Sequence, residues 1–130
     1  MTALVDTSAL YALLSREDPN HPAAARTFLG LRDGTSLVTH NYVVVEASAL
    51  AQRRLGGGSI RRLFDLLGPV QVLWVDEETH EAAIAALLAA PQRRPSLVDR
   101  VSFELMRRRG IEHAFAFDRD FREQGFSTVP

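Results

Sequence analysis

Segments typical of strands and helices alternate along this chain from its first residues to its last. Short apolar runs rich in β-branched residues, such as 36–40 and 70–75, are each followed by a longer segment with helical character. This alternation favours an α/β fold in which helices cover both faces of one short, mostly parallel sheet. Because no linker or repeat interrupts the pattern, residues 1–130 are expected to form a single domain with three α/β/α layers.

The expected elements follow from the apolar pattern and from the residues that typically cap helices. Strands are expected at 3–6, 36–40, 70–75 and 112–117, with a short edge strand at 127–130. Helices are expected at 8–15, 22–34, 42–55, 59–68, 77–90 and 97–109. Asn41, Asp76 and Ser96 are the expected N-caps of the third, fifth and sixth helices.

Four acidic residues stand where ligands bind in such folds, outside the carboxyl ends of the strands. Asp6 and Asp118 each end an apolar strand, and Asp99 and Glu46 lie near the starts of two helices. Each has a simpler explanation. Asp6 and Asp118 are good helix caps, Asp99 can form a capping box with Ser96, and Glu46 can lie on an exposed face.

The joint placement of the acids is harder to explain by capping alone. Carboxylates about 4 Å apart repel each other by roughly 4 kcal/mol at an effective dielectric constant near 20, so a cluster requires a cation. A set of oxygen ligands without cysteine suits Mg²⁺ or Mn²⁺ rather than zinc. The sequence therefore predicts a divalent-metal site.

Composition removes several other chemistries. All fifteen basic residues are arginine, so the chain lacks the lysine that a phosphate-binding P-loop requires. There is no cysteine for disulfides, which agrees with a reducing compartment such as the cytoplasm. No apolar run reaches the ~18 residues of a membrane span, and the first residues are expected to be a strand and a helix rather than a signal peptide. The net charge of −1 decides nothing about nucleic acid.

Several motifs, taken in order, resemble the PIN domain, and more narrowly the VapC-type toxins of bacterial toxin–antitoxin pairs. They are "LVDTSAL", Glu46 within "YVVVEASAL", "SLVDRVSFELMRRRGIEHAFAFDRDF" and the closing "GFSTVP". The resemblance covers essentially the whole chain. It implies a metal-dependent ribonuclease with a central parallel sheet, whose acids correspond here to Asp6, Glu46, Asp99 and Asp118.

Further positions follow from the same resemblance. Supporting hydroxyl groups correspond to Thr7 and Ser96, while Asp120 occupies a position that varies within the family and is a candidate metal ligand. Arg100 is bulkier than the small residue expected after the third acid. Arg93, Arg94 and Arg100 lie close to Asp99 in sequence and are candidates for contacts with RNA phosphates.

The predicted function is a Mg²⁺-dependent endoribonuclease, with Mn²⁺ able to substitute, in which metal-activated water hydrolyses the phosphodiester and leaves a 5′-phosphate. The expected partners are RNA, an antitoxin protein and a second copy of the chain, the homodimer forming through the apolar helices around "GGG" at 56–58.

The alternatives are a non-catalytic RNA- or partner-binding PIN domain and a metal-dependent DNA or flap nuclease. The intact acids argue against the first, and the short chain has no room for the DNA-clamping domain of the second.

The stretch "AFAFDRDF" separates two of the acids. In a continuing strand, Asp118 and Asp120 would point to the same face. Because polar residues and Gly125 follow, the strand is expected to stop at Phe117, leaving Asp118 at the site and Asp120 in a turn. Phe121 is expected to pack onto the core and fix that turn.

Overall fold

A single five-stranded sheet forms the centre of the protein. The computed structural model describes residues 1–90 and 94–130. Within them the strand order is β3-β2-β1-β4-β5, and every neighbouring pair is parallel. The strands are β1 (Thr2–Val5), β2 (Ser36–His40), β3 (Gln71–Leu73), β4 (His113–Phe115) and β5 (Ser127–Val129).

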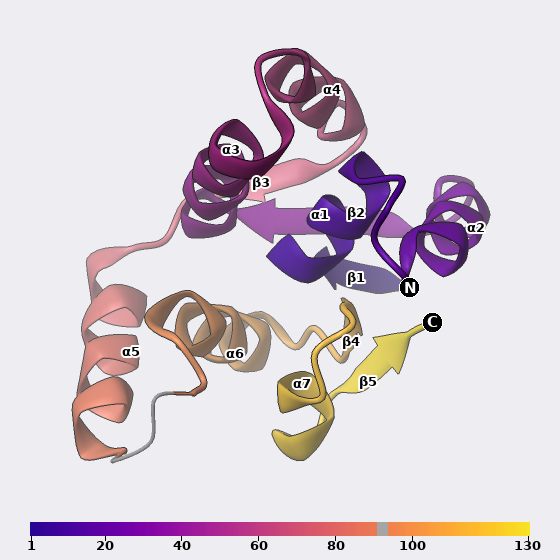
Figure 1. Ribbon diagram of the computed structural model, residues 1–130. Coiled ribbons are helices and arrows are strands. Elements are labelled where there is room, and N and C mark those ends of the chain that lie inside the picture. The colour runs from indigo at the N-terminus through magenta and orange to yellow at the C-terminus, as the bar shows by residue number, and fades with distance from the viewer. Residues whose placement is uncertain (91–93) are drawn as a thin grey trace.

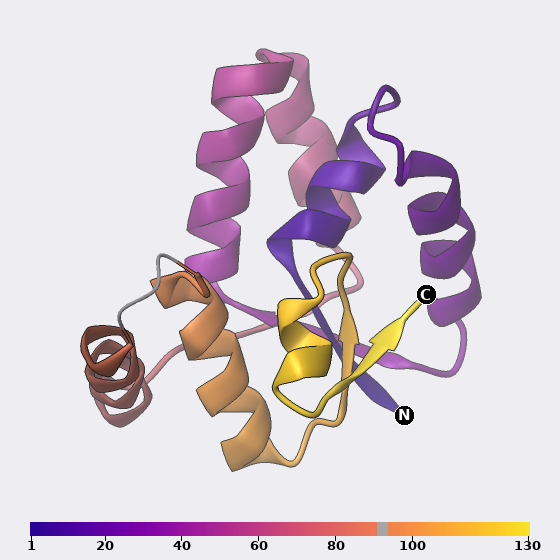
Figure 2. The same ribbon diagram turned by 60° about the horizontal axis from the view of Figure 1, so that its bottom comes forward.

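Helices cover both faces of this sheet (Figures 1 and 2). They are α1 (Thr7–Leu14), α2 (His21–Leu31), α3 (Asn41–Leu55), α4 (Gly58–Leu66), α5 (Glu77–Ala89), α6 (Leu97–Arg109) and α7 (Asp120–Glu123). The first four lie on one face, and α6 and α7 lie on the other, with α5 packed on the outside of α6. The predicted three-layer α/β/α fold is confirmed.

The central strand β1 explains why both faces need cover. Its side chains alternate between two apolar clusters, because successive residues of a strand point to opposite faces. Ala3 and Val5 belong to the cluster under α1 to α4, whereas Leu4 packs with Phe103 and Met106 of α6. All three β1 residues are fully buried, as expected of a parallel strand covered on both sides.

Most expected elements occur within one or two residues of their predicted bounds, and three predictions were wrong. The fourth strand ends at Phe115 rather than Phe117. Residues 120–123 form a short helix, α7, where a turn was expected. The N-cap of α3 is His40, whose ring nitrogen accepts a hydrogen bond from the Val43 amide at 3.4 Å. Asn41 instead accepts a bond from the Val75 amide at 2.8 Å.

Helix α6 begins and ends as the sequence predicts. Ser96 and Asp99 form the expected capping box, in which each side chain accepts a hydrogen bond from the other residue's backbone amide. Gly110 ends the helix with φ +67°, a left-handed conformation that glycine adopts without strain. The start of α6, and with it Asp99, is therefore held in a defined position.

No helix in the described part of the chain is both long enough and apolar enough to cross a membrane.

Candidate functional site

The parallel pairing of β1 with β4 brings Asp6 and Asp118 to the same edge of the sheet. Val5 is the register partner of Phe115, and the Asp6 amide continues the ladder by donating to the Phe115 carbonyl at 3.0 Å. Each strand then ends, so that the chain turns into α1 after β1 and toward α7 after β4. Two acids that are far apart in sequence therefore meet at the carboxyl ends of adjacent strands.

The Asp6 side chain is fixed by Ser8. Its Oδ2 accepts hydrogen bonds from the Ser8 hydroxyl at 2.7 Å and from the Ser8 amide at 3.2 Å, which makes Asp6 the N-cap of α1. The same hydroxyl accepts a bond from the Phe117 amide at 3.0 Å. Ser8 thus joins the acid at the end of β1 to the segment that carries Asp118. The capping role and the placement of Asp6 at the site coexist.

The sequence analysis chose Thr7 as the supporting hydroxyl and missed Ser8. A signal was available, because an N-cap aspartate accepts from the second or third residue after it. Thr7 has a different character. Its Oγ1 is buried and has no hydrogen-bond partner among the described residues, a situation that is uncommon unless a ligand or water supplies the partner.

Asp99 approaches the two strand-end acids from α6. Its Oδ2 accepts from the Ser96 amide at 3.2 Å, which orients the carboxylate while leaving the other oxygen free of this bond. One carboxylate oxygen each from Asp6, Asp99 and Asp118 lie within 4.8 Å of one another. Three oxygen donors converging in this way fit a hard divalent cation such as Mg²⁺ or Mn²⁺.

The pKa of each of the three acids is raised, chiefly by burial, so ionising all three is unfavourable without a cation. Burial raises the pKa of Asp6 to about 7, helped by the charges of Asp99 and Asp118 and opposed by the bond from Ser8. Burial also raises the pKa of Asp99 and of Asp118. A bound cation would reverse these directions, since an adjacent positive charge favours the ionised carboxylate.

The raised pKa of Asp6 predicts a pH-dependent difference in stability between the wild-type protein and Asp6→Asn in the absence of metal. The folded Asp6 carboxyl holds its proton up to about pH 7, whereas the unfolded carboxyl loses it near the model value of 3.8. Raising the pH through this window therefore favours unfolding of the wild type through Asp6, a contribution that the variant lacks. Its free energy of unfolding should fall relative to the variant by up to about 4 kcal/mol between pH 4 and pH 7, since one pKa unit is worth about 1.4 kcal/mol.

Chemical denaturation in EDTA at a series of pH values measures this difference. The buried His40, whose pKa burial lowers to about 4, acts in the opposite direction, but it is present in both proteins and cancels. The asparagine side chain of the variant can still accept the bonds from Ser8, so the cap is preserved. A difference that stays constant from pH 4 to pH 8 would show that Asp6 ionises in the folded protein as it does in water.

Glu46 lies outside the converging set of three acids. It is partly exposed on α3 and lines a shallow hollow with Tyr42, Val45 and Val98. Val98 immediately precedes Asp99, so this hollow reaches the first turn of α6. None of the three converging acids lines it.

A buried polar chain, missed from the sequence, fixes α3 relative to α6. The His40 Nε2 lies 2.8 Å from the Ser102 hydroxyl, which in turn donates to the Val98 carbonyl at 3.2 Å. His40 Nδ1 accepts from the Val43 amide, so the neutral ring donates through Nε2. The link runs from the end of β2 to the first turn of α6 and holds the helices of Glu46 and Asp99 in register. An isolated histidine and serine 62 positions apart give no sequence signal of such a contact.

The candidate arginines have different surroundings. Arg94 donates to Asp120 Oδ2 at 2.9 Å and lies 3.8 Å from Asp118 Oδ1. Arg100 Nε donates to the Pro95 carbonyl at 3.0 Å. Arg93 lies outside the described residues. Asp120 itself is buried at the start of α7, and the expected burial of Phe121 is confirmed.

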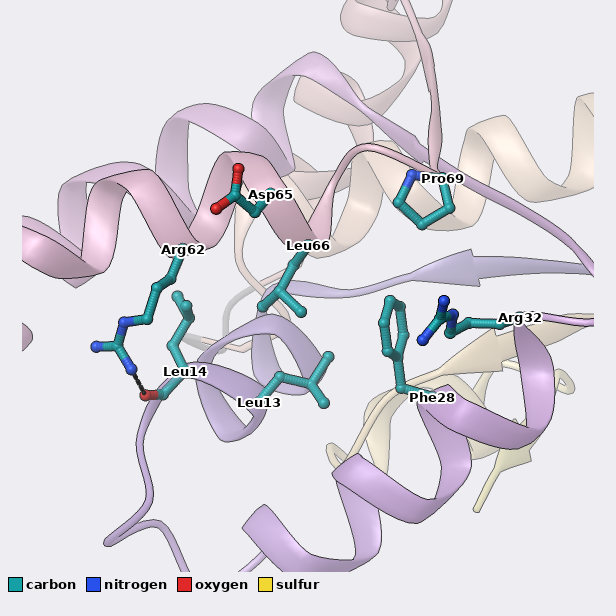
Figure 3. A pocket seen from close by; sticks show the side chains of 8 residues that line it. All are labelled: Leu13, Leu14, Phe28, Arg32, Arg62, Asp65, Leu66 and Pro69. Carbon is teal, nitrogen blue, oxygen red and sulfur yellow. Dashed lines mark hydrogen bonds between the residues drawn. The ribbon is translucent and has the colours of Figure 1, made fainter.

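A larger hollow, away from the residues of the converging set, has a different chemistry (Figure 3). It measures about 500 Å³ and is lined by α1, α2, α4 and the residues after α4, with Leu13, Phe28 and Leu66 on its apolar wall. Its rim carries the polar side chains of Arg32, Arg62 and Asp65. Arg62 donates a hydrogen bond to the Leu14 carbonyl at 3.3 Å. This mostly apolar hollow offers one carboxylate, so the converging acids remain the candidate site for metal chemistry.

Comparison with known proteins gives matches over almost the whole chain. The PIN domain family profile matches residues 3–127. The chain is 35% identical over 127 residues to the 23S rRNA-specific endonuclease VapC20 of Mycobacterium tuberculosis, covering 96% of this chain and 95% of the relative. The crystal structure of that protein, described as a sarcin–ricin loop cleaving toxin, matches with a TM-score of 0.86 at 33% identity, covering 97% of this chain and 96% of that one.

Two more distant structures share the fold alone. VapBC2 from Rickettsia felis, bound to a DNA fragment from its promoter, matches with a TM-score of 0.74 at 8% identity and covers 98% of this chain and 97% of that one. A toxin–antitoxin complex from Klebsiella pneumoniae matches with a TM-score of 0.69 at 14% identity, covering 98% and 96%.

Proposed function

The chain belongs to the PIN-domain family, and from that premise we propose that it is a divalent-metal-dependent endoribonuclease, the toxin of a toxin–antitoxin pair. The observation that carries the proposal is the convergence of Asp6, Asp99 and Asp118 at the carboxyl ends of β1 and β4, in a chain similar over almost its whole length to an rRNA endonuclease. A divalent ion bound there would activate water and offset the negative charge that develops on the phosphodiester.

The protein's own residues prepare the site for this task. Ser8 holds the Asp6 carboxylate by two hydrogen bonds, and Ser96 holds that of Asp99 by one, so two of the proposed ligands need no reorientation. Glu46, on α3, is proposed as a fourth acid that takes part in binding or in positioning water. Thr7 is proposed to offer its unpartnered hydroxyl to a ligand.

The proposed substrate is a structured ribosomal RNA loop, because the relative at 35% identity is named for cleavage of 23S rRNA. A ribosomal substrate goes with the cytoplasmic location expected from the sequence. Arg100 and Arg94 remain proposed phosphate contacts, although both have partners within the protein. The DNA or flap nuclease alternative requires cleavage of a DNA of matched sequence.

The test is cleavage of an RNA containing the 23S sarcin–ricin loop by the purified protein, with the matched DNA in parallel. We expect cleavage of the RNA in Mg²⁺ or Mn²⁺, none in EDTA and none of the DNA. The same ions should raise the melting temperature, because an ion that binds only the folded state stabilises it by about 2.7 kcal/mol at one hundred times its Kd.

Asp76→Asn is the matched control for variants of the acids. Asp76 is also a helix N-cap, accepting from the Thr79 amide at 2.8 Å, but it belongs to α5 and lies outside the converging set. This variant should cleave RNA normally and keep the metal-induced rise in melting temperature. Cleavage that persists in EDTA, or that is absent with every divalent ion, contradicts the proposed function.

We further propose an antitoxin protein and a second copy of this chain as partners. The antitoxin is supported by two structural matches, one described as VapBC2 and the other as a toxin–antitoxin complex. Charge complementarity favours an antitoxin segment that carries a basic side chain toward the acids.

The homodimer is supported by exposed apolar side chains on α3 and α4, Val45 and Phe64. Sedimentation that shows only monomer at high micromolar concentration would contradict the dimer.

A further inference from the structure

One positive side chain already reaches the acidic site from within the chain. Arg94, in the segment that precedes α6, donates from Nη2 to Asp120 Oδ2 at 2.9 Å, and the same nitrogen lies 3.8 Å from Asp118 Oδ1. Asp118 belongs to the converging set, whereas Asp120 does not. The guanidinium therefore stands on the side of Asp118 where a second cation would have to bind if it used both carboxylates.

The two partners of this contact differ in exposure. The side chain of Asp120 is only 9% exposed, whereas that of Arg94 is 66% exposed. A carboxylate so deeply buried is strongly disfavoured unless a cation accompanies it. Exposed ion pairs contribute little, but here the guanidinium supplies the partner that the buried carboxylate requires.

The backbone next to Arg94 is tied to α6. Arg100 donates from Nε to the Pro95 carbonyl at 3.0 Å, and the following residue, Ser96, forms the capping box with Asp99. The segment that carries the guanidinium is thus anchored to the helix that carries Asp99. Arg94 is held near the site by these bonds as well as by its own contact with Asp120.

We propose that Arg94 acts as a fixed cation at the Asp118–Asp120 side of the site, so that each chain binds one divalent ion rather than two. This inference rests on the proposed metal-dependent function. A second ion between these two carboxylates would be repelled by the guanidinium and would have to displace it. It would also have to lose hydration water, which Mg²⁺ gives up reluctantly. Three acids, Asp6, Asp99 and Asp118, remain for the single ion.

The proposal is tested by counting bound Mn²⁺ per chain, using isothermal titration calorimetry and native mass spectrometry of the full-length protein. The wild type should bind one ion. Arg94→Gln removes the positive charge and should bind a second ion through Asp118 and Asp120. Arg94→Lys keeps the charge and should still bind one, as should the double variant Arg94→Gln with Asp120→Asn, which removes the carboxylate that the second ion needs.

Arg119→Gln is the matched control. Arg119 lies between the two aspartates in sequence, yet it is exposed and pairs with Glu123 at 3.5 Å. Its replacement should leave one ion bound.

Two ions on the wild type, or one ion on Arg94→Gln, would overturn the inference and leave the proposed function standing. If no variant binds any ion, the proposed function fails together with it. The wild-type count keeps the test decisive even if Arg94→Gln does not fold.

Discussion

Replacing Asp118 by asparagine should lower the rate of RNA cleavage by on the order of a hundredfold or more, whereas Asp120→Asn should lower it only about tenfold. Asp118 shares the converging set with Asp6 and Asp99. An asparagine there keeps the shape and loses the charge that the proposed metal ion requires. Asp120 points instead to Arg94, so its loss acts on the site indirectly.

Both variants are measured on one RNA at saturating Mg²⁺, with Asp76→Asn in parallel. Equal losses would indicate that the two aspartates share a metal ion as a pair of ligands, which would also argue against Arg94 keeping metal away from Asp120. A larger loss for Asp120→Asn would mean that the roles of the two residues are reversed.

Asp99→Asn should abolish detectable cleavage while leaving the metal-free protein as stable as the wild type, or more stable. The amide oxygen of asparagine can still accept the bond from the Ser96 amide, so the start of α6 keeps its cap. The variant removes one charge from a cluster in which burial and the neighbouring Asp118 raise the pKa of Asp99. Relief of that repulsion offsets any weakening of the cap.

The free energy of unfolding in EDTA and the cleavage rate in Mg²⁺ are measured on the same preparation. Ser96→Ala serves as the comparison, because it removes the hydroxyl that accepts from the Asp99 amide and should cost about 1 kcal/mol. If Asp99→Asn loses as much stability as Ser96→Ala or more, the carboxylate of Asp99 is chiefly a structural cap.

The sheet and the converging acids could be predicted because both follow from local patterns. Short apolar strands that alternate with helices leave few arrangements other than a parallel sheet. Once the strands are parallel, an acid at the end of one lies at the same edge as an acid at the end of another. Asp6 and Asp118 therefore meet for a reason that is visible in the sequence.

The N-cap of α3 was predicted wrongly because contacts between distant residues determine it. Asparagine is a better N-cap than histidine by general preference, yet Asn41 is occupied by the Val75 amide from a distant segment. His40, buried against Ser102, takes the capping position instead. A contact that joins residues so far apart in sequence overrides a preference worth about 1 kcal/mol.

The fourth strand and Arg94 illustrate the same limit. Strand β4 stops at Phe115, where its register pairing with both β1 and β5 ends. The sequence of "AFAF" continues the strand pattern and does not reveal that its partner ends. Likewise, Arg94 was a candidate for contacts with RNA phosphates, and nothing local indicated its bond to Asp120, 26 positions later.

The pairing of β1 with β4 also sets when the candidate site can form during synthesis. Asp6 is translated before its partner strand and Asp118, which follow more than a hundred residues later. At roughly 5–20 residues per second, on the order of ten seconds separate the two. Until β4 has left the ribosome, β1 lacks one neighbour and the acids cannot converge. The nascent chain therefore cannot form the proposed metal site until β4 has been made.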